Sequence, residues 1–573
     1  MKRDWKRNIK VVWLCGAMIG FVTVSASWST PARAQVIILN AQTPNADAIY
    51  DVPALISTPL NAKVLKSSEE DGIVTEEVMF HSEMDGAKSV DIFAIFSYPK
   101  GAKNLPAFIW NQTGLAQASS YLTVLGARRG YAALCIDFPN TGYRSTGNYA
   151  INSGLEVSEN PRDSPIYHGA VALLKAVSYL QSRPEVNGDR IGMVGSSWGG
   201  FFTTVMAGID PRLKAASAMF GTGNLQLGNA WWDGNRKTRE RPEAERERWR
   251  TTLDPALRLP TSKVPIAWFS GTNDSYYWMP ALMKSYAMAN ENKSLTLMPN
   301  WDHGLPPQLD EQVFVWLDSH LKAAPQFLKV APIQLKKQGK AVLAQWQYSG
   351  PREVTSAELI LSYGGDENWV RRVWSTLPVT WKDGAATVAL PSSTIPFYIS
   401  GTMIDKDGFR YSTPLLEVGP STFGKKPKPQ MLVPNGATTW GGFEESDIRF
   451  LKGMAFPTPA VSDDAHSGKQ AAKLVAGQNG FAPLLFTTGV AHQFSAWVKA
   501  DKATTLKLEM KAQFDGIAKT ASQEYSIGTR WTIITFAFPI PAAKLADVGV
   551  ILIAPENASI LVDDVSFVPV WKK

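Results

Sequence analysis

Residues 73–322 alternate between two hydrophobic patterns, one typical of buried strands and one typical of amphipathic helices. The predicted strands are Val90–Tyr98, Leu105–Trp110, Tyr131–Phe138, Arg190–Val194, Lys214–Phe220, Val264–Phe269 and Ser294–Met298. The predicted helices are Ala116–Arg129, Ser164–Arg183, Trp198–Ile209, Pro280–Ala289 and Gln308–Leu321. Such alternation predicts an α/β fold, in which a mostly parallel sheet carries helices on both faces.

Residues 224–260 interrupt this alternation between two predicted strands. They contain Trp231-Trp232 and then the mixed-charge stretch Arg236–Arg250, which is typical of a solvated helix with ion pairs four residues apart. Long insertions between strands often serve binding, so the same segment is also a candidate cap over an active site. The two interpretations are compatible.

The pattern changes after about Pro325. Short alternating runs separated by Gly, Pro and Asp predict a small β-sandwich over residues 330–418. Strand-like runs also predict an all-β fold for residues 435–570. Between them, Ser421–Pro434 holds three prolines and three lysines, which is typical of a linker. The predicted organisation is an α/β domain over 35–324, a β-sandwich over 325–420, a linker over 421–434 and a β-domain over 435–573.

The first 34 residues have the features of a signal peptide. A basic start precedes an apolar run from Ile9 to about Val24, and Ala32-Arg33-Ala34 matches a cleavage site. A permanent membrane anchor would need about 20 apolar residues, and Gly16 and Gly20 interrupt this run. We therefore expect an exported protein, periplasmic or extracellular, with no membrane segment after cleavage.

Composition sharpens this picture. The 573 residues carry 58 Lys+Arg and 51 Asp+Glu, a formal charge of +7 that invites a nucleic-acid partner. Residues 1–34 hold six of the basic residues and one acid, so cleavage leaves 52 against 50, a charge of +2. Nucleic acid is thereby excluded as an expected partner. The two cysteines cannot form a disulfide framework, and after cleavage only Cys135 remains, in a predicted central strand.

The clearest chemical signal is Gly195-Ser-Ser-Trp-Gly199, a G-x-S-x-G motif centred on Ser197. A predicted strand precedes it and a predicted helix follows, which is the context of a nucleophile elbow. Small residues flank the serine and permit the sharp turn. We therefore predict that Ser197 is a nucleophile exposed above the sheet.

A serine nucleophile needs a base, and the base needs an acid that holds its tautomer. Four histidines follow Ser197, and of these His303 lies in a loop between the last predicted strand and the last helix, where such a base belongs. Asp274 directly follows the strand Val264–Phe269 and is the predicted acid. Asp302 adjoins the histidine and is expected to orient its loop.

The tetrahedral intermediate of acyl transfer needs two backbone N–H donors. One is predicted at Trp198, the residue after the nucleophile, and the second in the loop Trp110–Gly114, at Gln112 or Thr113.

These motifs resemble the α/β-hydrolase superfamily, in its acetyl xylan esterase, dienelactone hydrolase and prolyl-oligopeptidase-like branch. The resemblance rests on Gly195–Gly200, Gly271-Thr-Asn-Asp274 and Trp301-Asp-His-Gly304 and covers a little under half of the chain. The segment Gly271–Trp278 also resembles the PhoPQ-activated pathogenicity-related proteins, although the nucleophile segment departs from theirs. The resemblance implies a hydrolase. None of its residues demands a cofactor, and no Cys/His cluster in this region has the spacing of metal ligands, so we expect no cofactor for catalysis.

Residues 435–570 resemble carbohydrate-binding modules with a galactose-binding-like jelly roll. The carriers include Gly441–Glu445, Phe494–Lys499 and Leu561–Val565. By this resemblance Glu444 and Asp563 are candidate ligands of a structural calcium, with solvated turn acids as the alternative, and the module is a candidate glycan binder.

Aromatic residues near the predicted triad are candidates for the substrate pocket: Trp231, Trp232, Tyr276, Tyr277 and Trp301, with Tyr143 as a weaker one. Core packing would account for about half of them. The leading hypothesis is a secreted serine esterase that cleaves acetyl or similar esters on carbohydrate, or a small ester. The alternatives are a serine peptidase of prolyl-oligopeptidase type and a non-catalytic glycan-binding surface protein.

Overall fold

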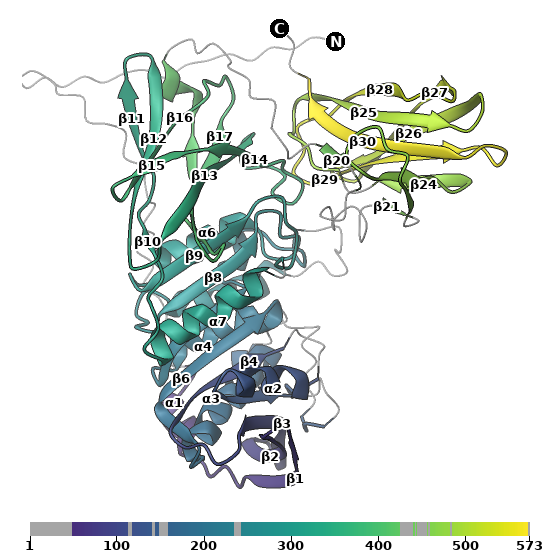
Figure 1. Ribbon diagram of the computed structural model, residues 1–573. Helices are drawn as coiled ribbons and strands as arrows, with labels where there is room; N and C mark the ends of the chain where they lie inside the picture. The colour runs from purple at the N-terminus through teal and green to yellow at the C-terminus, as the bar shows by residue number, and fades with distance from the viewer. Residues whose placement is uncertain are drawn as a thin grey trace, which may run out of the picture. The chain divides into compact units, whose positions relative to one another are not determined.

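Figure 1 shows the computed structural model of the chain. It describes residues 49–112, 117–139, 144–147, 157, 159–233, 242–306, 308–424, 439–441, 443, 455–456, 459–481 and 484–570. The predicted signal peptide, Tyr143, Thr113, Glu444 and most of the predicted linker lie outside these ranges. All described residues belong to one compact unit of the chain. None of the helices within these ranges is long and apolar enough to cross a membrane.

The α/β part is built on one sheet, which in the described residues has nine strands in the order β1-β2-β3-β5-β4-β6-β7-β8-β9. Strands β1 to β3 and β5 pair antiparallel, whereas β5, β4, β6, β7, β8 and β9 pair parallel. This confirms the predicted mostly parallel sheet. The strands are β1 Lys63–Glu70, β2 Ile73–Asp85, β3 Lys88–Pro99, β4 Leu105–Asn111, β5 Ala132–Ile136, β6 Val186–Ser196, β7 Leu213–Met219, β8 Ile266–Gly271 and β9 Lys293–Met298.

Helices cover both faces of the sheet because its central strands are apolar on both sides. One face packs against α3, α4 and α6, and the other packs against α2 and α7. Cys135 of β5 is fully buried, and burial raises the pKa of its thiol to about 12. The helices are α1 Val52–Ser57, α2 Ser120–Arg128, α3 Pro165–Ser182, α4 Trp198–Ile209, α5 Glu243–Thr252, α6 Met279–Met288 and α7 Gln308–Leu321, with short 3-10 turns η3 Pro161–Asp163, η4 Leu225–Leu227, η5 Pro255–Arg258 and η6 Pro420–Phe423.

A local signal sets the start of α3. The Ser164 side chain accepts the Ile166 N–H and caps α3, whose first residue is Pro165, as its sequence predicts. The first predicted helix was expected to start at Ala116, which is wrong, because this helix, α2, begins at Ser120. Ala118 instead donates its backbone N–H to the buried Asp137 carboxylate, which holds residues 117–119 outside the helix.

The insertion between β7 and β8 contains η4, α5 and η5. Its charged helix α5 begins at Glu243, later than the predicted Arg236, and residues 234–241 are outside the described ranges. The helix is not solvated all round, because Trp249 is fully buried against Phe201 of α4 and Trp232. This tryptophan anchors the insertion to the α/β core.

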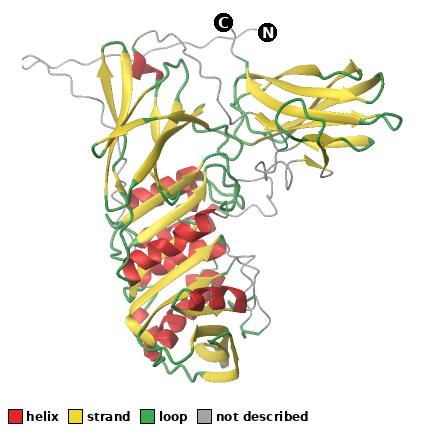
Figure 2. Cartoon of the chain, viewed as in Figure 1, coloured by secondary structure: helices red, strands yellow, loops and turns green. Residues whose placement is uncertain are grey.

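The rest of the described chain forms antiparallel sheets (Figure 2). Two of these sheets lie in the region of the predicted sandwich. The first sheet contains β10 Lys329–Val330, β11 Gln334–Gln338, β12 Ala341–Ser349, β15 Thr380–Lys382 and β16 Ala385–Ala389. The second sheet contains β13 Val354–Tyr363, β14 Ser375–Pro378, β17 Phe397–Asp405, β18 Arg410–Ser412 and β19 Leu416–Val418. Their apolar residues continue the core around α7, since Trp316 packs against Phe327 and Phe327 against Tyr411.

Two further sheets form the C-terminal part, which has a hydrophobic core of its own. One contains β20 Thr439–Gly441, β22 Ala460–Ser462, β23 Ala471–Lys473, β25 Ala491–Ala500, β28 Thr532–Pro539 and β30 Ile560–Pro569, and the other contains β21 Ala455–Phe456, β24 Gly477–Phe481, β26 Thr504–Phe514, β27 Ile517–Ile527 and β29 Ala546–Ala554. Strand β27 has no hydrophobic alternation and was not predicted. It forms because it pairs with β26 along its whole length.

Candidate active site

Ser197 lies at the sharp turn between β6 and α4. Its backbone has φ 56° and ψ −120°, a conformation that costs a non-glycine residue of the order of 1–3 kcal/mol. Glycines make the turn possible: a Cβ on Gly195 would lie 2.2 Å from the Gly199 carbonyl oxygen, and one on Gly199 would lie 2.1 Å from that of Asn111. The predicted strand–turn–helix context is therefore present, with the serine held in a strained backbone.

The structure brings together the three residues predicted to form the triad. Ser197 Oγ and His303 Nε2 are 2.8 Å apart, and His303 Nδ1 is 3.0 Å from both carboxylate oxygens of Asp274. When Nδ1 carries the proton and donates it to Asp274, Nε2 is free to accept the hydroxyl proton of Ser197. The arrangement can thus move a proton away from the serine.

Asp274 is held rigidly at the end of β8. Its side chain is fully buried, and its Oδ1 accepts the backbone N–H groups of Tyr276 and Tyr277, both at 2.8 Å. These bonds satisfy a carboxylate that would otherwise be costly to bury. The carboxylate therefore keeps one orientation toward His303.

Asp302 joins the loops of the acid and the base. Its Oδ1 accepts the backbone N–H of Ser275 at 2.9 Å and that of His303 at 2.7 Å. The side chain is thus engaged with the backbone of both loops, while Asp274 contacts the imidazole. This matches the sequence-based expectation that Asp302 orients the loop.

The β-sandwich region braces the same two loops, which the sequence did not reveal. Asn273 Nδ2 donates to the carbonyls of Val370 and Arg372, at 3.1 and 2.7 Å. Asn300 Nδ2 donates to the Trp374 carbonyl at 2.7 Å and Asn300 Oδ1 accepts its N–H at 2.7 Å. Each asparagine is close in sequence to a predicted triad residue. This proximity is the one feature of the sequence that could have indicated a role for them in positioning the triad.

Of the two predicted oxyanion donors, Trp198 directly follows the serine in the chain, and Gln112 directly follows β4, the strand that pairs with β6. Trp198 is the first residue of α4, where backbone N–H groups have no partner within the helix. Asn111, the last residue of β4, pairs with Gly195 of β6. Residues 113–116, which include the alternative donor Thr113, are outside the described ranges. Both donors stay predictions.

Aromatic side chains surround His303. The ring of Tyr276 lies 4.6 Å from the imidazole and that of Tyr277 lies 6.0 Å away, stacked. Phe220, which was not predicted, lies 4.8 Å from it edge-on, with φ 36° just after β7. Burial, reinforced by the Asp274 charge, raises the pKa of Tyr277 well above its usual value, so this phenol stays neutral.

The other aromatic candidates divide between site and core. Trp231 packs against Trp198, with ring centroids 5.0 Å apart, and against Tyr276. Trp301 is half-buried, and its carbonyl accepts the Asn273 N–H. Trp232 does not belong with them: it is 7% exposed and packs edge-on against Trp249, which is buried against Phe201 of α4.

The described residues do not make up a metal site. Asp563 Oδ2 accepts the backbone N–H groups of His466 and Ser467, and burial raises the pKa of this carboxyl. The described ranges contain no group of three or more His, Cys, Asp or Glu side chains arranged to hold a metal ion. Since Glu444 lies outside those ranges, the calcium site stays a prediction.

Residues 112–322 match the Dienelactone hydrolase family. The matched region contains Ser197, Asp274 and His303, and the α/β part of the chain is a serine hydrolase domain. No curated protein matches this chain in sequence.

Solved structures are similar to the α/β part. An acetyl xylan esterase from Paenibacillus sp. R4 is 19% identical and the match covers 48% of this chain and 94% of that one, with a TM-score of 0.42. Acetyl xylan esterase 1 from Thermoanaerobacterium sp. JW/SL YS485 is 17% identical, with 48% and 92% covered and a TM-score of 0.42. A cold-adapted esterase from an Arctic intertidal metagenomic library is 15% identical, with 46% and 100% covered and a TM-score of 0.33.

Proposed function

We propose that this protein is an exported serine esterase that removes acetyl or similar acyl groups from carbohydrate. The observation that carries the proposal is the hydrogen-bonded relay from Ser197 Oγ through His303 to the buried Asp274. A serine hydroxyl becomes a competent nucleophile when such a base takes its proton.

In the proposed mechanism, Ser197 Oγ attacks the ester carbonyl carbon while His303 Nε2 takes its proton. Asp274 stabilises the resulting imidazolium, and the backbone N–H groups of Trp198 and Gln112 stabilise the oxyanion. His303 then gives its proton to the departing alcohol oxygen, which leaves an acyl group on Ser197. Water attacks the acyl-enzyme with His303 again as base, and the carboxylic acid is released. Apart from the attacking water, these steps use only the side chains of the triad and the two backbone N–H donors.

The aromatic surroundings of the base support a carbohydrate as the alcohol part. Tyr276 is partly exposed beside His303, and Trp231 is partly exposed beside Tyr276. Flat aromatic faces such as these stack on the apolar faces of sugar rings. The resemblance of residues 435–570 to carbohydrate-binding modules points to the same substrate class. In this proposal the C-terminal part also binds glycan.

The decisive experiment compares hydrolysis of 4-nitrophenyl acetate by the wild type and the Ser197→Ala variant. We expect the variant to lose at least about a thousandfold in kcat. Ser196→Ala is the matched control, because the motif holds two adjacent serines and Ser197 is the one that hydrogen-bonds His303; it should retain most of the activity. Equal rates for wild type and Ser197→Ala would exclude the proposal.

Two further assays define the substrate. Release of acetate from acetylated xylan, without cleavage of peptide substrates, is the expected result; the reverse would identify a peptidase. A glycan array probed with full-length Ser197→Ala protein tests glycan binding apart from turnover.

Export is tested by sequencing the N-terminus of protein recovered outside the cytoplasm. The proposal expects a mature chain that begins at Gln35. A chain that retains residues 1–34 would contradict cleavage at that site.

A further inference from the structure

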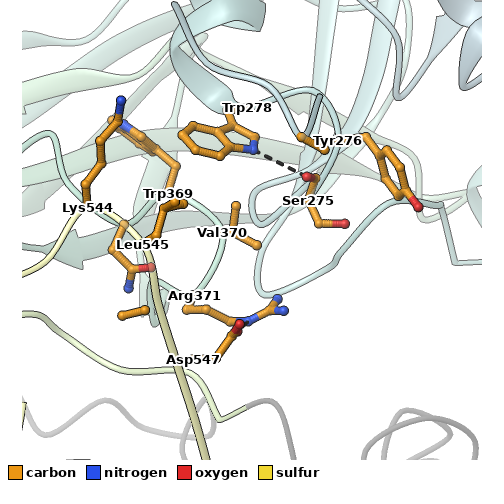
Figure 3. Close-up of a pocket in the computed structure, with 12 residues that line it drawn as sticks. Ser275, Tyr276, Trp278, Trp369, Val370, Arg371, Lys544, Leu545 and Asp547 are labelled. Atoms are coloured by element: carbon orange, nitrogen blue, oxygen red, sulfur yellow. Dashed lines mark hydrogen bonds and ion pairs between the residues drawn. The ribbon is translucent and has the colours of Figure 1, made fainter. Parts of the chain in front are cut away.

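A cavity of about 230 Å³ lies where three distant segments of the chain meet (Figure 3). The first segment is 275–278, after β8, together with Ala230. The second is 368–371, from the connection between β13 and β14, and the third is 544–547, at the start of β29. The α/β part, the β-sandwich region and the C-terminal part thus each supply part of its wall.

The cavity is one side chain away from the base. Tyr276 lines it, and the ring of Tyr276 lies 4.6 Å from the imidazole of His303. Ser275, another lining residue, donates its backbone N–H to Asp302, whose carboxylate also accepts the N–H of His303. A group held in this cavity against Tyr276 would therefore be separated from the imidazole of His303 by one aromatic ring.

The lining combines flat aromatic faces with hydrogen-bonding groups. Tyr276, Trp278 and Trp369 provide aromatic surface, and Figure 3 shows the indole of Trp278 fixed by its N–H bond to the Ser275 carbonyl. Asn368 is 5% exposed, and within the described residues its side-chain nitrogen has no hydrogen-bond partner. Leaving a buried amide N–H without a hydrogen bond is costly. A ligand oxygen that accepts a hydrogen bond from the Asn368 amide would remove this cost.

The charges of the lining are already balanced, which excludes an anion as the preferred ligand. Arg371 Nε lies 2.8 Å from Asp547, and Figure 3 shows the two side chains together at one end of the cavity. Lys544 Nζ lies 3.3 Å from Asp233. Paired ions can still exchange hydrogen bonds with hydroxyl groups, but they offer no net positive field to a carboxylate or phosphate.

The volume of the cavity fits about one ring of a ligand. Pockets for drug-sized ligands start at about 300 Å³, and this cavity has about 230 Å³. Aromatic faces, an unpaired amide donor and balanced charges suit a compact, neutral, hydroxyl-rich ring.

We infer that this cavity is the subsite for the neutral sugar ring that carries the scissile ester, and that the C-terminal part contributes to it through residues 544–547. The inference rests on the proposed function and gives it a substrate class: esters of neutral sugars, not of uronic acids. It also makes the C-terminal part a component of the substrate site.

The test uses full-length protein and two probes without an ester, methyl β-D-xylopyranoside as the neutral ring and sodium glucuronate as the anionic one. Isothermal titration calorimetry measures the Kd of each. The main variant is Asn368→Gly, since Asn368 has φ 53° and glycine accepts that backbone conformation. Asn61→Gly is the matched control, because Asn61 has φ 45° and is exposed far from the cavity along the chain.

We expect wild type and Asn61→Gly to bind the xyloside equally and more tightly than glucuronate, and Asn368→Gly to bind it about 3- to 10-fold more weakly. The KM of Asn368→Gly for acetylated methyl xyloside should rise by a similar factor, whereas that of Asn61→Gly should stay within about twofold of the wild-type value. Lys544→Ala is a second variant that should fold, because its side chain is 67% exposed, and a weaker loss is expected there.

The inference is overturned if wild type binds neither probe or if glucuronate binds more tightly than the xyloside. It is also overturned if Asn368→Gly and Lys544→Ala both bind the xyloside with the Kd of the wild type. Failure of the proposed function gives a different result: no hydrolysis of any ester by wild type, whatever the Kd values. Melting temperatures of Asn368→Gly and Asn61→Gly within a few degrees of wild type show that a change in Kd reflects the lost amide.

Discussion

Asn300 and Trp374 exchange two hydrogen bonds of 2.7 Å each, one from the Asn300 side-chain amide to the Trp374 carbonyl and one from the Trp374 N–H to the amide oxygen. Asn300 begins the loop that carries His303, and Trp374 belongs to the β-sandwich region, where it is fully buried. The position of the proposed base therefore depends on residues outside the α/β part. Hydrolase activity and the integrity of the β-sandwich should be linked.

The first prediction concerns this pair. Asn300→Gly removes both hydrogen bonds, and glycine tolerates the φ of 56° found at this position. We expect the free energy of unfolding to fall by about 1–3 kcal/mol and kcat for 4-nitrophenyl acetate to fall about tenfold, because a small displacement of a catalytic group costs rate. Denaturant unfolding and steady-state kinetics measure the two effects. Unchanged kcat would show that the His303 loop holds its position without the sandwich.

The second prediction separates the two aspartates near His303. Asp274→Asn should lower kcat about 10⁴-fold, as expected when the acid of a triad can no longer hold the histidine tautomer. Asp302→Asn should lower kcat less than about tenfold, because an amide oxygen still accepts the N–H groups of Ser275 and His303. Equal losses in the two variants would contradict the assignment of Asp274 as the acid.

The third prediction tests the glycines of the turn. A Cβ on Gly199 would lie 2.1 Å from the Asn111 carbonyl oxygen and 2.7 Å from that of Gln112, and these backbone atoms leave it no room. Gly199→Ala should destabilise the fold by about 3 kcal/mol and abolish activity. Gly188→Ala is the control, since its Cβ would meet Gln181 at 3.5 Å, an ordinary contact. Thermal unfolding of Gly199→Ala and Gly188→Ala measures the difference. Similar melting temperatures for the two variants would contradict the close contact between Gly199 and the Asn111 carbonyl.

The fourth prediction is a pH dependence of the C-terminal part. His492 is fully buried in β25, where its Nε2 accepts the Thr487 N–H and its Nδ1 donates to the Val490 carbonyl. Burial lowers the pKa of His492 from 6.5 to about 4. The folded state therefore favours the neutral ring, so its contribution to stability is fully present above pH 6.5 and is lost as the pH falls toward 4.

The loss over that range should be on the order of 3 kcal/mol, at about 1.4 kcal/mol per pKa unit. Calorimetric melting at several values between pH 4 and pH 7 measures it. In the His492→Gln variant, which does not titrate there, the decline should be shallower. An identical decline in both proteins would rule out His492 as the origin.

Much of the α/β part could be predicted from its sequence because its signals are local. The helix Trp198–Ile209 was predicted with the bounds that the structure has, and the parallel strands are continuous apolar runs. Ser197, Asp274 and His303 could be selected together because each follows the end of a buried strand, and parallel strands end at one edge of a sheet.

Other features depend on partners that lie far away in the chain. Strand β27 is almost entirely exposed and polar, so its pairing with β26 gives no periodic signal. Phe220 has a left-handed backbone conformation and packs against His303, and no sequence motif predicts this contact. Trp232 lies in the core although its neighbour Trp231 packs against Trp198, and nothing in the dipeptide distinguishes the two.

The sequence by itself thus determined the order of elements, the parallel sheet and the three residues that meet at its edge, because each follows from short-range patterns in neighbouring residues. Tertiary structure alone decided that Asn273 and Asn300 are braced by the β-sandwich and that residues near 276, 369 and 545 enclose one cavity. The physical reason is that those contacts join segments about 70 to 270 residues apart, and side-chain packing and hydrogen bonds between such segments form only when the whole chain has folded.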